Sequence, residues 1–147
     1  NNEGKFTKVM IEKTIIDALK PDPVLKTKVT LYAGEAAIFS RLAPEQAKQP
    51  YITVNITRSQ TIGDLVLHDF ILMVDYWDYG TSTKKAGEAS ERIEYIFDNK
   101  QFDHERYSSI RIWFFSGGWV SEEDPRAIHY NQQFSVRACR KKWINQL

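Results

Sequence analysis

The chain has three histidines, the residues most often found in metal and acid–base sites: His68, His104 and His129. None has a second histidine at i+4 or a Cys-x-x-Cys pair nearby, the spacings that make a zinc site recognisable in sequence. In principle His68, Asp75 and Asp78 could surround a divalent metal, as in a small nuclease. Adjacent strand residues point to opposite faces, however, so His68 and Asp69 cannot converge on one ion. We therefore predict no metal site and no cofactor.

Other catalytic patterns are missing from the sequence. Cys139 stands at a strand end, with no helix N-terminus or catalytic histidine signature beside it to activate the thiol. No G-x-S-x-G, P-loop or G-x-G-x-x-G occurs, and Gly117-Gly118 is too short to cradle a phosphate, so we expect a turn there. We predict that the protein is not an enzyme and has no catalytic residues. A metal-dependent nuclease or hydrolase built on His68, Asp75 and Asp78 is the enzymatic alternative.

Large hydrophobic side chains are more informative. Trp77, Trp113, Phe115 and Trp119 fall where a helix on one face of a sheet leaves them on the other face or in a loop. The segment around Trp113 and Phe115 is apolar on both sides. Either a second layer within the domain, supplied by the first helix, covers it, or a neighbouring subunit does. For Trp119, which lies beside the acidic cluster Glu122 to Asp124, contact with a partner is favoured over packing within the chain.

Hydrophobic periodicity gives the elements that position these residues. A helical stripe over 6–20 ends at Pro21 and Pro23, and the segment 22–28 suits a short turn capped by Asp22. Strict alternation marks the strand that contains Ile52, Val54 and Ile56, and the strand after it. The predicted elements are a helix over 6–20, strands over 36–42, 51–57 and 65–77, a helix over 81–97, and strands over 107–116 and 127–139. A loop over 43–50, a hairpin link over 58–64 and a linker over 117–125 connect them.

This order, α-β-β-β-α-β-β, predicts an α+β domain in which helices pack on a mainly antiparallel sheet. The expected core stripes are Phe70, Leu72, Val74 and Tyr76 in the second long strand, and Ala86, Ala89, Ile93, Ile96 and Phe97 in the second helix. Residues 1–147 are expected to form one domain, with 1–5 flexible.

Composition narrows the class of protein. The 147 residues are 42% hydrophobic and 27% charged, with a formal charge of +1 and a single short basic run at Arg140-Lys141-Lys142. Tight binding to a nucleic-acid backbone needs several clustered cations, so it is not expected. One cysteine forbids an intrachain disulfide and fits folding in a reducing cytosol. No apolar run is long enough for a membrane span, and the amino end has no signal-peptide pattern.

The layout resembles a family of tail-terminator and tail-completion proteins of long-tailed bacteriophages. The resemblance rests on a leading helix, a polar loop, and a strand that opens with Pro50-Tyr51-Ile52-Thr53-Val54. A long strand then runs into a Ser/Thr-capped helix with small residues in its first turns, over 72–97. Two further strands joined by the acid-containing turn 122–125 complete it. The resemblance extends over about 11–140 and lies in architecture and weak positional pattern.

The resemblance implies a structural virion protein that forms a ring, usually a hexamer, at the head-proximal end of the tail tube. Such a ring ends tube polymerisation and joins the tail to the head connector, while DNA passes through the lumen without specific binding. It also implies a protein made in the bacterial host cytoplasm and located in the virion tail or neck. The candidate partner-contact residues are Arg58, Gln60, Thr61, Trp113, Phe115, Trp119, Val120, Glu122 and Glu123.

Three alternatives stay open. A head-completion or stopper protein of the neck has similar requirements and differs in where it binds. A small nuclease would need the metal group described above. A nucleic-acid-binding module would use Tyr51, Trp77 or Trp113 as stacking platforms.

Overall fold

The computed structural model describes residues 2–62 and 67–140, and among these the side chains of 11–57 and 67–140. The helices are α1 (Asn2–Leu19), α2 (Pro23–Lys26) and α3 (Lys84–Phe97). The strands are β1 (Leu31–Tyr32), β2 (Glu35–Ala36), β3 (Ile38–Ser40), β4 (Tyr51–Ile62), β5 (Leu67–Tyr79), β6 (Lys100–Phe102), β7 (Tyr107–Trp119) and β8 (Ala127–Arg140).

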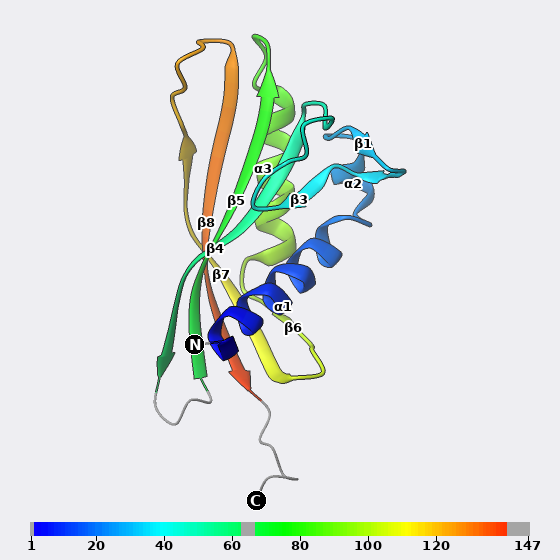
Figure 1. The fold of residues 1–147 in the computed structure, drawn as a ribbon. Helices are drawn as coiled ribbons and strands as arrows, with labels where there is room; N and C mark the ends of the chain where they lie inside the picture. Colours follow the sequence, from blue (N-terminus) through cyan, green and yellow to red (C-terminus); the bar gives the residue numbers. More distant parts are fainter. Residues whose placement is uncertain (1, 63–66, 141–147) are drawn as a thin grey trace, which may run out of the picture.

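Six strands form one twisted sheet in the order β3-β4-β5-β8-β7-β6, and β1 pairs only with β2 (Figure 1). All neighbours in the large sheet are antiparallel except β3 and β4, which are parallel. The four central strands are long, whereas β3 and β6 at the two edges have three residues each. The predicted α+β class with a mainly antiparallel sheet is confirmed.

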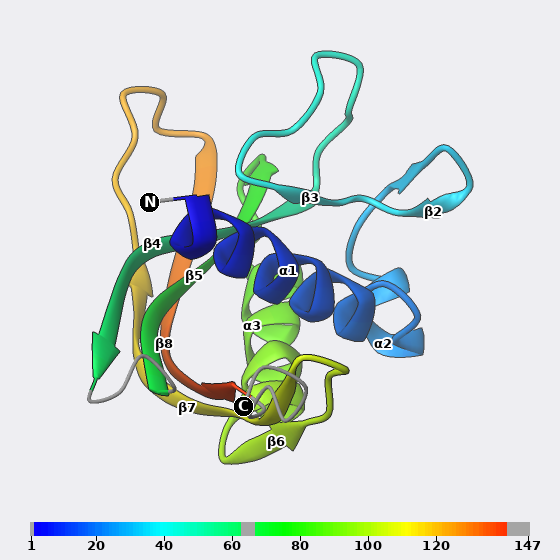
Figure 2. The ribbon, with the colours of Figure 1, turned by 60° about the horizontal axis from the view of Figure 1, so that its bottom comes forward.

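The helices all pack on one face of this sheet, which curves around α3 (Figure 2). Ala86, Ala89, Ile93 and Phe97 of α3 are buried, as their spacing predicted, and α3 contacts β5, β8 and β7. The two alanines let the helix approach the strands closely. The alternating residues of β4, β5 and β7 that face the helices are buried as well: Ile52, Val54, Phe70, Leu72, Val74, Tyr76, Ile110 and Ile112.

α1 lies on this same face, against β3 and β4, and buries Ile11, Ile15 and Leu19. It also carries a buried carboxylate, Glu12, which accepts a hydrogen bond of 2.9 Å from the backbone N–H of Ile56 and one of 2.6 Å from the Ser40 hydroxyl. These bonds fix the helix to the two strands. α1 therefore does not cover the face that carries Trp113. This corrects the sequence-based alternative in which the first helix supplies a second layer over the segment around Trp113 and Phe115.

Several boundaries differ from the prediction. β4 continues to Ile62 and β7 to Trp119, so residues 58–62 and 117–119 are strand rather than loop. Their Thr, Ser, Gln and Gly residues mimic turn composition, but pairing with β5 and β8 outweighs this local preference. The predicted strand 36–42 is divided into β2 and β3, and β1 and β6 are too short to leave a periodic signal.

Asp22 connects the helices and gives a pH-dependent test of the fold. It accepts the Leu25 N–H as the N-cap of α2, and Arg92 of α3 donates to it at 2.7 and 3.1 Å. Burial raises the pKa of this carboxyl, but the bonds from Arg92 and Leu25 outweigh burial and hold the pKa below its usual value. A carboxyl whose pKa is lower in the folded state stabilises the fold above its unfolded pKa, and this contribution is lost as pH falls through the folded pKa.

We predict that Asp22→Asn, which keeps a capping oxygen but loses the ion pair, lowers the free energy of unfolding at pH 7. The difference from wild type should shrink below about pH 4, where the carboxyl of the unfolded chain takes up its proton. Urea unfolding at a series of pH values measures this. Asp17→Asn is the control, because Asp17 pairs with Lys13 on an exposed helix surface and should change little. A pH-independent difference for Asp22→Asn would contradict the assignment.

Candidate functional site

The face of the sheet opposite the helices is uncovered by any described element, and we call it the open face. β5 contributes Asp69, Ile71, Met73, Asp75 and Trp77 to it, and β8 contributes His129, Asn131, Gln133, Ser135 and Arg137 through direct pairing. These side chains alternate along each strand with the buried core residues. The open face is therefore mixed: Ile71, Met73 and Trp77 of β5 are apolar, and the five residues from β8 are polar.

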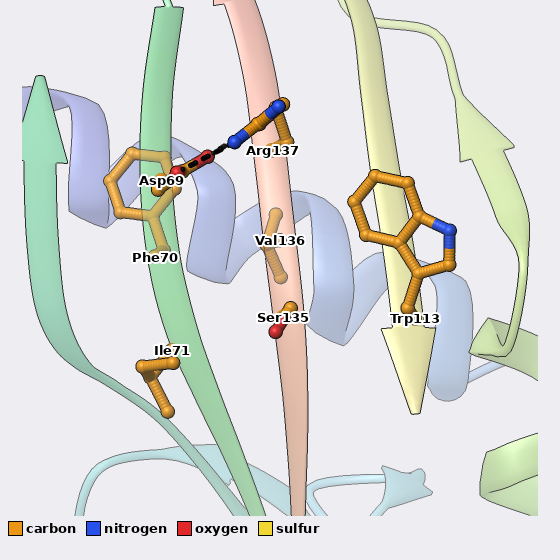
Figure 3. A pocket seen from close by; sticks show the side chains of 7 residues that line it. All are labelled: Asp69, Phe70, Ile71, Trp113, Ser135, Val136 and Arg137. Atoms are coloured by element: carbon orange, nitrogen blue, oxygen red, sulfur yellow. Dashed lines mark hydrogen bonds and ion pairs between the residues drawn. The ribbon is translucent and has the colours of Figure 1, made fainter. Parts of the chain in front are cut away.

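The middle of the open face has a shallow pocket between β5, β8 and β7. Figure 3 shows Ile71 on one side, Trp113 on the other and Ser135 between them, with an ion pair at one end. Asp69 accepts two hydrogen bonds from the guanidinium of Arg137, at 2.7 and 3.0 Å. The hydrogen bond to Asp69 raises the pKa of Arg137. The pocket thus combines the apolar side chains of Ile71 and Trp113 with one ion pair.

A second cluster on the open face is centred on His129. The His129 ring is stacked on Trp77, with 3.6 Å between ring centroids, and its nitrogens lie 2.6 Å from an oxygen of Asp75 and 2.8 Å from one of Glu122. Asn131 donates to the same Asp75 oxygen at 2.8 Å. His129 thus ties the loop after β7 to strand β5.

The acidic loop is held within the chain rather than simply solvated. Glu122 contacts His129, and Asp124 bonds the hydroxyl of Tyr79, a bond that raises the pKa of that tyrosine. Asp124 also accepts the Arg126 N–H at 2.9 Å. Glu123 is exposed. Of the acids predicted as contacts, Glu122 has a structural partner, and Glu123 is open to solvent.

The predicted hydrophobic contact residues are exposed, in different places. Phe115 is 63% exposed at a bulge of β7, and Trp119 is 55% exposed. Trp119 lies in the strand rather than in a loop, edge-on to Tyr130 with 4.8 Å between ring centroids. Val120 continues the exposed end of this hairpin, whereas Trp113 is half-buried beside the pocket. Arg58, Gln60 and Thr61 belong to β4, but their side chains lie outside the described residues.

The structure does not assemble the residues of the nuclease alternative. His68 is buried on the covered face, Asp75 is on the open face, and six residues of strand lie between them. Within 2–62 and 67–140, no group of three or more His, Cys, Asp or Glu side chains is placed to hold a metal ion. Over the same ranges, no helix combines the length and the hydrophobicity needed to cross a membrane.

Sequence reasoning missed the His129 cluster. Asp75 and His129 are 54 positions apart, and they meet because β5 and β8 pair in one particular register. No local spacing signals such a pair. The one available signal was the two-residue spacing of side chains along a strand. It puts Asp75 and Trp77 on one face of their strand, and His129 and Asn131 on one face of theirs.

We predict that His129→Ala lowers the free energy of unfolding by about 1–3 kcal/mol, the usual cost of leaving buried polar partners unmet. His129→Phe, which keeps the stacking on Trp77 but removes both hydrogen bonds, should recover only part of this loss. Urea unfolding followed by tryptophan fluorescence measures both variants. His104→Ala is the comparison, because His104 lies half-buried in the loop before β7 and accepts one hydrogen bond, from the neighbouring Arg106 N–H. Equal stability of His129→Ala and wild type would exclude a structural role for the cluster.

Comparisons with known proteins place the fold. No protein-family model and no curated protein sequence matches the chain. Among solved structures, the chain is similar to a protein chain in the virion of a native gene transfer agent (GTA) particle. The TM-score is 0.66 at 14% sequence identity, over 86% of this chain and 92% of the other. At this identity the likeness establishes a shared fold that includes nearly all of both chains.

Proposed function

We propose that this protein is a structural component of a phage-like virion, and that it forms a ring at the head-proximal end of a tail tube. In that position it ends tube polymerisation and joins the tail to the head connector. The observation that carries the proposal is the fold shared with a chain of a GTA virion over most of both sequences. The layout of helices and strands, which resembles tail terminators, supports the more specific role.

The surface of the chain also favours assembly. The open face presents apolar side chains around Ile71 and Trp113 without a covering layer among the described residues. Phe115 is exposed as well, at the bulge of β7, whereas Trp119 is exposed on the helix side of the sheet, beside Tyr130. Large exposed apolar surfaces mark contacts with partners. The described ion pairs and hydrogen bonds of the open face join side chains of the same chain.

The two ends of the long sheet give such a ring two different faces. The hairpin between β7 and β8 lies at one end of the sheet, and the distal part of β4 lies at the other (Figure 1). We infer that one end contacts the tail tube and the other the connector. The nearly neutral charge of +1 suits a lumen through which DNA passes without being held.

Mass in solution combined with negative-stain imaging tests the proposal. We expect a closed ring with a central hole, and binding of the purified protein to tail tubes. Binding to the head connector alone would instead favour the stopper role. A protein that stays monomeric at high concentration and is absent from purified particles would exclude the proposed function.

We predict that Phe115→Asp reduces the oligomer mass, because it places a charge on an apolar surface that a partner must desolvate. Leu42→Asp is the matched control, since Leu42 is 82% exposed in the loop after β3 and far from β7 in sequence. Light scattering at several protein concentrations compares the two. If Phe115→Asp assembles as well as Leu42→Asp, the surface around Phe115 is not a subunit contact.

We also predict that Trp119→Ala leaves the chain folded but impairs attachment of heads to tails. Trp119 buries only part of its ring against Tyr130, so its removal should cost the monomer little. Circular dichroism checks the fold, and counting joined particles by electron microscopy checks the function. Wild-type yields of joined particles would remove Trp119 from the contact surface.

A further inference from the structure

The outer side of β7 is only partly paired. β6 pairs with Ile110 to Ile112, and no described strand pairs with the outer side of the segment Trp113 to Trp119, which we call the β7 edge. The hydrogen bond from Val120 N to His129 O shows which residues of β7 point inward to β8. Because backbone groups alternate in direction along a strand, Gly117 and Trp119 point theirs outward.

The outer side of β4 has the same design. β3 pairs with Ile52 to Val54, and no described strand pairs with the outer side of the segment Asn55 to Ile62, which we call the β4 edge. Each edge begins beside a bulge, at Thr57 in β4 and at Phe115 in β7. In the strand order the two edges are on opposite sides of the sheet. They lie at opposite ends of its long strands (Figure 1).

In each edge, a carboxylate satisfies the first outward N–H beyond the short strand. Glu12 accepts from Ile56 N at 2.9 Å, and Asp98 accepts from Phe114 N at 2.8 Å. Beyond these bonds, each edge has a bulge, and α1 packs beside the first part of the β4 edge, but neither edge carries the proline or lysine that usually blocks strand pairing. The β7 edge, Trp-Phe-Phe-Ser-Gly-Gly-Trp, has no charged residue and no proline, and the β4 edge has only Arg58.

We propose that the β7 edge of one copy pairs, antiparallel, with the β4 edge of the next copy, so that the sheets of successive subunits form one continuous wall. This inference rests on the proposed function, since it supplies the lateral contact of the ring. The contact is heterologous: each copy offers one edge to one neighbour and the other edge to the second. Such contacts form closed rings when the rotation between copies closes.

The short outer strands determine the register. Strand β5 gives a common scale for the height of the two edges. Arg58 pairs with Ile71 of β5, whereas Gly118 pairs with Asn131 of β8, which pairs with Asp75 of β5. Gly118 is therefore four residues away from Arg58 along this scale. If the neighbour is displaced by four residues, Gly118 comes opposite Arg58 and Gly117 opposite Ser59. In this register β3 lies just beyond the end of the neighbour's β7, and the neighbour's β6 lies just beyond Ile62. A smaller displacement brings these strands into collision.

The same displacement gives the strand tilt that closed sheets require. Four residues correspond to about 13 Å along the strands, and the four long strands of one copy span about 19 Å across them. The ratio corresponds to a tilt of about 35°, within the range found in closed barrels. Edges at equal height would need no tilt and would leave β3 and β6 in the way. The offset of the two edges and closure of a ring are therefore compatible.

Disulfide formation between copies tests this register. We would combine Arg58→Cys with Gly118→Cys in a Cys139→Ser background, which removes the single native thiol. An added Cβ at Gly118 meets nothing within 4 Å, so this substitution is tolerated. Within one copy β5 and β8 separate the two positions, which is too far for a disulfide, so each bond must join two copies. Mild oxidation of the assembled protein should give a ladder of covalent oligomers larger than dimers.

Ser59→Cys with Gly118→Cys is the matched control, because a one-residue change of register places the two side chains on opposite faces of the wall. We expect at least a tenfold lower yield of cross-linked oligomers from it. If rings assemble but the two cysteine pairs cross-link equally well, the edge pairing is overturned and the proposed function is left intact. Products limited to dimers would show symmetric pairing and also contradict it. A protein that forms no oligomer would remove the proposed function together with this inference.

Discussion

A sheet has two faces, and this chain supplies helices for only one of them. Burial of alternating apolar residues such as Leu72 and Phe134 against α3 drives the fold, because removing apolar surface from water is the largest favourable term. The same alternation sends Ile71, Met73 and Trp113 to the opposite face. Since α1 packs on β3 and β4, on the same face as α3 (Figure 2), these side chains have no cover within the described chain. The open face is thus a direct consequence of how the core forms.

Polar groups on the open face are satisfied in pairs that stiffen it. Arg137 neutralises Asp69 across two strands, and His129 joins Asp75 to the loop that carries Glu122. Paired charges cost less to cover than isolated ones, so another protein can lie on such a surface without leaving a buried charge unmet. Stacking of Trp77 on His129 adds rigidity to the same region. A surface organised in this way is suited to contact between proteins.

Sequence periodicity predicted the central elements because their side chains decide burial locally. The stripe of α3 and the alternation of β4 and β5 follow from spacing alone. The prediction ended these two strands, β4 and β7, at 57 and 116 and was wrong there. The polar and glycine residues that follow are strand only because they pair with a neighbouring strand. Gly117 has a reason that no local pattern carries: a Cβ there would lie 2.8 Å from the Tyr130 hydroxyl oxygen. The contact of Asp75 with His129 likewise depends on the register between two strands.

The lengths of the strands connect the fold to assembly. If β3 and β6 were as long as their neighbours, they would pair along the whole of β4 and β7 and would themselves form the two edges of the sheet. Instead each has three residues and leaves the far half of β4 or β7 unpaired. Glu12 and Asp98 satisfy the first exposed N–H in each case, so that the unpaired segments begin at defined positions. Unpaired backbone groups at an edge gain hydrogen bonds from another strand at little cost in chain entropy, because the edge is already ordered. A chain that leaves two such segments, on opposite sides and offset in height, has the geometry that repeated head-to-tail contact requires.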